Sequence, residues 1–172
     1  MITDNVFDSL KTIDEYNLNQ RKEVPFIIYG KKTKGGAILL DDLYCHFDKL
    51  QENTASIEKL EDFLFARLNV FLQDNMKEQV IVIGHTHPFT TRISFNYSIS
   101  DLCYHLFYYN YNVFHNGCNG NILLSFIKTI NQDYNFIIYD HISQTFKTFN
   151  KVYLQTKKKE FIPLSALNYC DD

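Results

Sequence analysis

The apolar run Val80-Ile81-Val82-Ile83, followed directly by Gly84-His85-Thr86-His87, places the strongest constraint on the fold of this 172-residue chain. Successive β-branched apolar residues predict a buried strand. Because side chains alternate between the two faces of a strand, His85 and His87 point the same way, at the spacing that one metal ion needs. The sequence therefore predicts a strand that ends in two imidazoles able to chelate a metal.

A carboxylate lies a short distance downstream, in the segment Ser98-Ile99-Ser100-Asp101. A catalytic zinc usually has three protein ligands and keeps a fourth position for water, so Asp101 is the natural third ligand. Each half of the pattern also has a structural reading, since one strand histidine is usually a core residue and Ser-x-x-Asp commonly caps a helix. The order of strand, His-x-His, loop and capped helix favours a zinc hydrolase in which Asp101 both caps and ligates.

A hydrolytic zinc site also needs a base outside the ligand set, and Glu23 is the candidate. It opens residues 23–30, which predict an apolar strand entered from a helix over residues 4–21. Residues 31–36 predict a turn, 37–40 a return strand, 41–53 an irregular acidic segment and 54–75 a long amphipathic helix. A further helix is expected from about Asp101, with its Phe and Tyr residues in the core, and strands over residues 122–127, 135–139 and 145–149.

Taken in order, these motifs resemble the JAMM (MPN) metalloprotease family over about residues 1–140. The residues that carry the resemblance are Glu23 seven residues before Gly30, His85-Thr-His87-Pro88, and Ser98-x-x-Asp101. It implies an α/β fold: a single MPN/JAB-like (cytidine-deaminase-like) domain with a curved mixed β-sheet flanked by helices. It also implies one Zn²⁺ per chain held by His85, His87 and Asp101, with Glu23 activating water and Ser98 stabilising the tetrahedral intermediate.

The usual substrate of that family is the C-terminal tail of ubiquitin or a ubiquitin-like protein joined to an amine. The resemblance thus implies a zinc metalloprotease or isopeptidase that takes a ubiquitin-like protein or its conjugate, like the compact prokaryotic members. Two alternatives stay open, because a fold does not fix a function. One is a non-catalytic MPN-type scaffold, and the other is a RadC-like protein.

Two features depart from the family pattern. The spacing from His87 to Ser98 is three residues longer than is common, which predicts a reshaped loop beside the site. We expect this loop to contact substrate through four side chains, Phe89, Arg92, Phe95 and Tyr97; an inert surface loop is the alternative. The second departure is Pro25, which a strand tolerates at its start or at an edge.

Length and composition predict one domain over residues 1–156, followed by a tail over 157–172 that either packs on the domain or is flexible. A net charge of −3 gives no electrostatic case for nucleic acid. The N-terminus lacks the features of a signal peptide, and no apolar run is long enough for a membrane span, so a cytoplasmic protein is expected. The four cysteines lack metal-ligand spacing and are expected to be reduced thiols.

Overall fold

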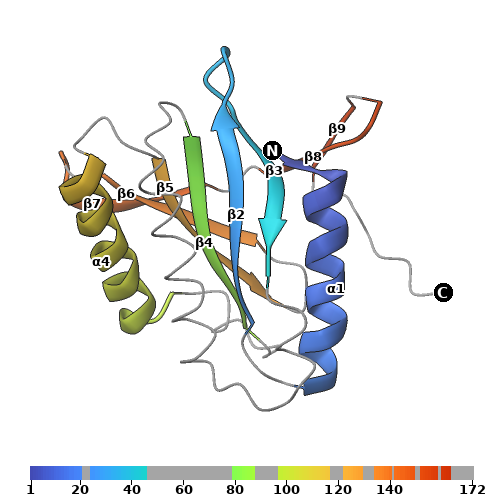
Figure 1. The fold of residues 1–172 in the computed structure, drawn as a ribbon, viewed down its shortest axis with the longest axis horizontal. Coiled ribbons are helices and arrows are strands. Elements are labelled where there is room, and N and C mark those ends of the chain that lie inside the picture. The colour runs from blue at the N-terminus through green and yellow to red at the C-terminus, as the bar shows by residue number, and fades with distance from the viewer. Residues whose placement is uncertain are drawn as a thin grey trace.

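The computed structural model describes residues 1–20, 24–45, 79–87, 97–116, 122–129, 134–140, 142–149, 152–158 and 160–163. These residues form two helices and nine strands (Figure 1). In chain order the elements are β1 (Ile2–Thr3), α1 (Asp4–Gln20), β2 (Pro25–Lys32), β3 (Ile38–Tyr44), β4 (Gln79–His87), α4 (Ile99–Asn116), β5 (Ile122–Thr129), β6 (Tyr134–Asp140), β7 (Thr145–Phe149), β8 (Tyr153–Gln155) and β9 (Phe161–Pro163). Neither described helix is both long enough and apolar enough to cross a bilayer.

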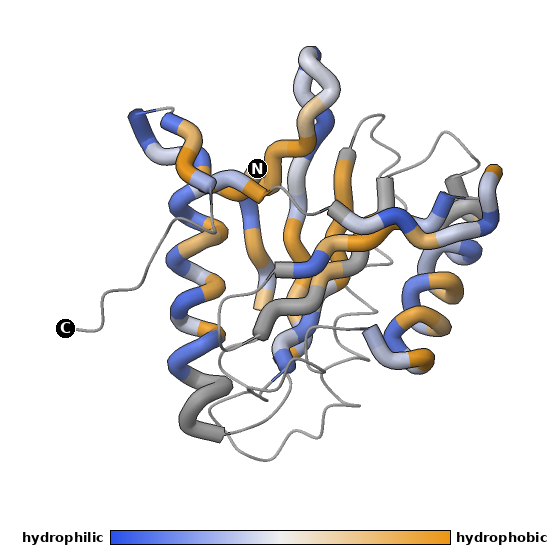
Figure 2. The backbone as a smooth tube through the Cα atoms, turned by 180° about the vertical axis from the view of Figure 1, so that it is seen from behind, coloured by the Kyte–Doolittle hydropathy of each residue, from blue (hydrophilic) through white to orange (hydrophobic). Residues whose placement is uncertain are grey.

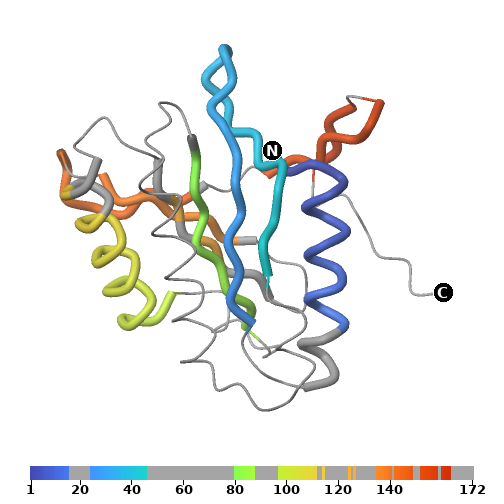
Figure 3. Tube along the Cα trace, viewed as in Figure 1, coloured from blue at the N-terminus to red at the C-terminus, as the bar shows by residue number. Residues whose placement is uncertain are grey.

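The strands make one mixed sheet, in the order β7-β6-β5-β4-β2-β3-β1-β8-β9. β4 runs parallel to β5, and β1 runs parallel to both β3 and β8, while the other neighbours are antiparallel. Figure 3 shows the first strand and the β8–β9 hairpin meeting on one side of the molecule. The prediction of a mixed α/β sheet with helices is therefore confirmed.

Helix α1 covers one face of the sheet. It follows Thr3, whose Oγ1 accepts a hydrogen bond from the Val6 amide at 3.5 Å, so a threonine caps its first turn. Val6, Leu10 and Ile13 recur at helical spacing and are fully buried. Seen from behind in Figure 2, the apolar residues of α1 line its side toward the sheet. The helix predicted over residues 4–21 is thus confirmed, together with its apolar stripe.

The two faces of the sheet are buried to different extents. The face toward α1 belongs to a large apolar cluster that includes Phe26, Ile28, Val80 and Val82. The opposite face carries a smaller cluster of Ile27, Tyr29 and Ile81, against which tyrosines of α4 pack. Alternate residues of β2 and β4 therefore serve two separate cores, as the continuous apolar runs of these central strands require.

Two expectations from the sequence are wrong in part. β3 does not end near residue 40 but continues through Tyr44, because Asp42, Leu43 and Tyr44 pair with β2 after a register shift at Asp41. The aromatic residues of α4 are not all core: Phe107 is 55% exposed and Phe114 is 84% exposed. These two side chains face solvent, so α4 buries only part of its aromatic surface.

The remaining expectations have mixed outcomes. The strands expected over 122–127, 135–139 and 145–149 are present as β5, β6 and β7. Pro25 is the first residue of β2, where its missing amide costs no ladder hydrogen bond. Phe161–Pro163, placed in the tail, pairs with β8 as β9. The helix expected over 54–75 lies outside the described residues.

Candidate metal centre

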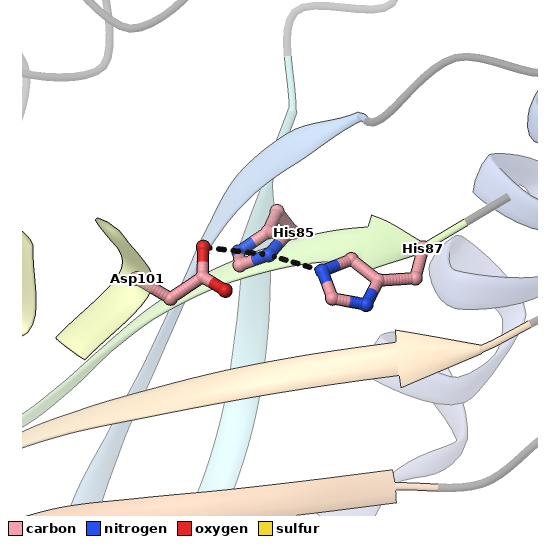
Figure 4. Close-up of side chains that lie close together, drawn as sticks. All are labelled: His85, His87 and Asp101. Atoms are coloured by element: carbon pink, nitrogen blue, oxygen red, sulfur yellow. Dashed lines mark hydrogen bonds and ion pairs between the residues drawn. The ribbon is translucent and has the colours of Figure 1, made fainter. Parts of the chain in front are cut away.

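β4 brings two imidazoles to the end of an interior strand. Ile81 faces the smaller core, and by strand alternation His85 and His87 lie on that same face, which α4 covers. Figure 4 shows both rings extending from the end of β4 toward Asp101, which comes from the first turn of α4. The side-chain direction predicted from the i, i+2 spacing is therefore confirmed.

Gly84 sets the packing directly behind the histidines. It lies opposite Phe26 on β2 and beside Phe126 on β5, and these two rings contact each other edge to face at 5.6 Å. A Cβ at position 84 would lie 2.2 Å from Cε2 of Phe26. Phe126 in turn stacks on Phe136 with a centroid distance of 4.1 Å. A residue without a side chain is thus required where the aromatic core packs against the strand that bears the two histidines.

Thr86, between the two histidines, fixes the end of the strand from the opposite face. Its buried Oγ1 accepts a hydrogen bond from the Val24 amide at 3.0 Å, and its own amide donates to the Val24 carbonyl at 3.1 Å. These bonds extend the pairing of β2 and β4 beyond Pro25, which lies opposite His85. The strand that bears the imidazoles is therefore held in register up to its last residues.

Helix α4 begins with a reciprocal cap. The Asp101 amide donates to Ser98 Oγ at 3.2 Å, and the Ser98 amide donates to Asp101 Oδ2 at 2.7 Å. This is the capping-box arrangement, with Asp in place of the usual Glu or Gln. The second carboxylate oxygen, Oδ1, faces His85 at 3.4 Å from Nε2. Asp101 thus caps the helix with one oxygen and presents the other to the histidines.

The three side chains converge on one point. Nε2 of His85 and Nε2 of His87 are 2.9 Å apart, and the ligand atoms of His85, His87 and Asp101 all lie within 4.8 Å of one another. Ligand atoms that share one tetrahedral zinc are about 3.3–3.6 Å apart, given bonds of about 2.0–2.2 Å. His85 Nε2 is close to that spacing from both partners, at 2.9 Å from His87 Nε2 and 3.4 Å from Asp101 Oδ1. Two imidazoles and one carboxylate fit a catalytic zinc, for which three protein ligands are typical.

Burial keeps His85 in the form that binds a metal. Desolvation lowers its pKa from 6.5 to about 4; the neighbouring His87 adds to this effect, while the Asp101 carboxylate opposes it. The His85 imidazole is therefore neutral at pH 7 and has a lone pair to offer. Only the neutral ring can be a metal ligand, so burial favours the form of His85 that could bind a metal.

Of the other predicted site residues, Ser98 and Tyr97 are described. Ser98 is exposed next to Asp101, where its hydroxyl is accessible from solvent. Tyr97 is half-buried, and its hydroxyl donates to the Asn135 carbonyl at 2.7 Å. The proposed base Glu23 and the loop residues Phe89, Arg92 and Phe95 lie outside the described residues.

Cys103 and His105 of α4 do not form a thiol–imidazole pair. Cys103 and His105 are two residues apart on a helix, so their side chains point in different directions. Cys103 is exposed, whereas His105 is 1% exposed and packs edge to face on Phe146 of β7 at 5.6 Å. This burial could not be predicted from the amino-acid pattern, because a histidine in an aromatic helix is equally compatible with either face.

No protein-family model matches this chain. An uncharacterised protein of Caenorhabditis elegans is 37% identical to it over 59 residues, which make up 33% of this chain and 14% of that protein. The matched segment is thus a small part of a much longer relative, and the relative's name describes no activity. Any assignment of function to this chain therefore depends on the chemistry of the candidate metal centre.

Proposed function

We propose that this chain is a zinc-dependent peptidase or isopeptidase of the JAMM type, acting on the C-terminal tail of a ubiquitin-like protein. The observation that carries the proposal is the convergence of His85, His87 and Asp101 on one point. These residues come from a strand and from a helix cap, so their meeting is a property of the fold. The choice of substrate and of zinc depends on the resemblance of the motifs to that family.

The chain supplies a group for each part of an amide hydrolysis. His85, His87 and Asp101 would hold the metal, which when bound polarises the scissile carbonyl and makes water more acidic. Ser98 Oγ already accepts the Asp101 N–H, so its hydroxyl proton can be donated to the carbonyl oxygen as negative charge develops there. Ser98 is therefore suited to the role that the resemblance implies.

Glu23 is proposed as the base. It takes a proton from the attacking water and returns it to the leaving amine, so that one water is consumed as a C–O bond replaces the C–N bond. Among the described residues, the position of Val24 supports this role for Glu23, because the two are neighbours in the chain. Glu23 directly precedes Val24. The amide and carbonyl of Val24 both form hydrogen bonds with Thr86, the residue between the two histidines.

The first test is metal content. After zinc reconstitution, wild-type protein should hold one zinc per chain by elemental analysis, and the double variant His85→Ala/His87→Ala should hold none. His46→Ala, which removes a histidine outside the motif, is the matched control and should keep its zinc. Wild-type protein without zinc would refute the proposal.

The second test separates an enzyme from a scaffold. Glu23→Gln cannot accept the proton, so it should keep its zinc while hydrolysis of a ubiquitin-like protein with a C-terminal fluorogenic amide falls about 10²–10⁴-fold. Loss of zinc in this variant would show that Glu23 is a ligand instead. A zinc-loaded wild-type protein that cleaves no such amide would favour the non-catalytic alternative.

A further inference from the structure

Tyr97 connects the helix cap that carries Asp101 to the sheet that carries the histidines. It immediately precedes Ser98, and its hydroxyl donates a 2.7 Å hydrogen bond to the carbonyl of Asn135 in β6. The partner lies 38 residues further along the chain, so this is a tertiary contact and not part of the turn. It fixes the start of α4 relative to β6.

The acceptor of this bond lies in the same row of the sheet as His85. In the pairing of β4 with β5, His85 is opposite Ile127, and in the pairing of β5 with β6, Ile127 is opposite Asn135. His85, Ile127 and Asn135 thus form one line across three neighbouring strands. The Asn135 carbonyl is about 10 Å from the His85 backbone, since adjacent strands are about 4.8 Å apart.

We infer that Tyr97 is a positioning residue for the metal centre, and that it acts through Asp101. The route is short: Tyr97 holds Ser98 in place, the Ser98 amide holds Asp101 Oδ2, and Asp101 Oδ1 faces His85. The cap alone orients Asp101 relative to its own helix but not relative to the sheet. The hydrogen bond from the Tyr97 hydroxyl fixes the cap relative to the sheet, at the row of residues that contains His85.

The expected size of the effect follows from the position of Tyr97 relative to the ligand Asp101. Removing a group that orients a metal ligand typically weakens metal affinity about 10–100-fold. Tyr97 acts one step further away, so the effect should be near the lower limit.

The inference depends only on the metal-binding part of the proposed function, and it can be tested by metal affinity alone. Tyr97→Phe removes the hydroxyl and keeps the ring, and it should weaken zinc binding roughly tenfold in a chelator competition at a temperature where the protein stays folded. Tyr104→Phe is the matched control, because it removes the hydroxyl of a half-exposed tyrosine on α4 and should leave zinc affinity unchanged.

A double-mutant cycle tests the route through Asp101. In an Asp101→Asn background, Tyr97→Phe should cause no additional loss of affinity, since the group that it orients is already weakened as a ligand. An undiminished tenfold loss in that background would refute the route, and unchanged affinity of Tyr97→Phe alone would refute the inference while leaving the metal centre intact. Wild-type protein that fails to bind zinc would instead refute the proposed function.

Discussion

Gly84→Ala tests whether the aromatic packing behind the histidines is as tight as the structure shows. Judged by backbone propensity alone, alanine should stabilise a strand interior by about 0.5–1 kcal/mol relative to glycine. The added Cβ, however, would lie 2.2, 2.6 and 2.8 Å from three ring carbons of Phe26. Favourable carbon–carbon contacts lie at about 3.5–4.0 Å, so the ring must move by more than about 1 Å.

The ring of Phe26 has little room for that movement. It is fully buried and contacts Phe126, which stacks on Phe136. Overpacking of this kind costs about 1–3 kcal/mol, and because all three contacts are with an enclosed ring we take the upper half of the range. After the backbone gain is subtracted, Gly84→Ala should lower the free energy of unfolding by about 2 kcal/mol.

Urea denaturation followed by circular dichroism is the suitable assay, because the chain contains no tryptophan. The midpoint should fall by about 1 M. Gly35→Ala is the control, since a Cβ there meets only Thr33 Oγ1 at 4.0 Å, and its stability should stay within about 0.5 kcal/mol of wild type. In the double variant Gly84→Ala/Phe26→Leu the smaller side chain should relieve the overlap, with a favourable coupling of about 1 kcal/mol. A Gly84→Ala variant as stable as wild type would refute the reasoning.

Two further predictions concern buried polar groups. Thr86→Val should lower the free energy of unfolding by about 1–3 kcal/mol, because the Val24 amide loses its acceptor, whereas Thr86→Ser keeps the hydroxyl and should lose less; equal denaturation midpoints for Thr86→Val and wild type would contradict this. Burial lowers the pKa of His105 from 6.5 to about 4, so between these values the unfolded chain binds a proton that the folded chain does not. The stability that His105 contributes is therefore complete above pH 6.5 and is lost as the pH falls toward 4, on the order of 3 kcal/mol. His105→Gln should flatten the fall in stability of metal-free protein between about pH 7 and pH 4.5, and a slope equal to that of wild type would contradict the assignment.

Much of the candidate metal centre could be predicted from the sequence because its geometry is local. Two histidines at i and i+2 on an apolar strand must share a face, and Ser98 and Asp101 three residues apart form a cap whatever the rest of the chain does. The helix α1 and the central strands were predictable for the same reason, since their apolar periodicity extends over many residues. These predictions depend on backbone geometry within a few residues of each position.

Other features depend on which strands become neighbours, and only the tertiary structure shows them. The acidic segment after residue 40 joins β3 because β2 is available as its partner, which its own composition disfavours. The exposed aromatic side of α4 could not be predicted, because aromatic residues occupy both sides of this helix and give no clear apolar stripe.

The difference between what the sequence determines and what the tertiary structure determines is clearest at the candidate site. The sequence determined which side chains could bind a metal: His85, His87 and Asp101, each placed by spacing within its own element. The tertiary structure decided that the two elements meet, and the Tyr97–Asn135 hydrogen bond ties the start of α4 to the sheet. The Thr86–Val24 pairing and the space that Gly84 leaves for Phe26 hold β4 against β2. The physical reason is the range of the interactions. Alternation along a strand and capping of a helix act over two or three residues, whereas the contacts that bring ligands together join residues tens of positions apart.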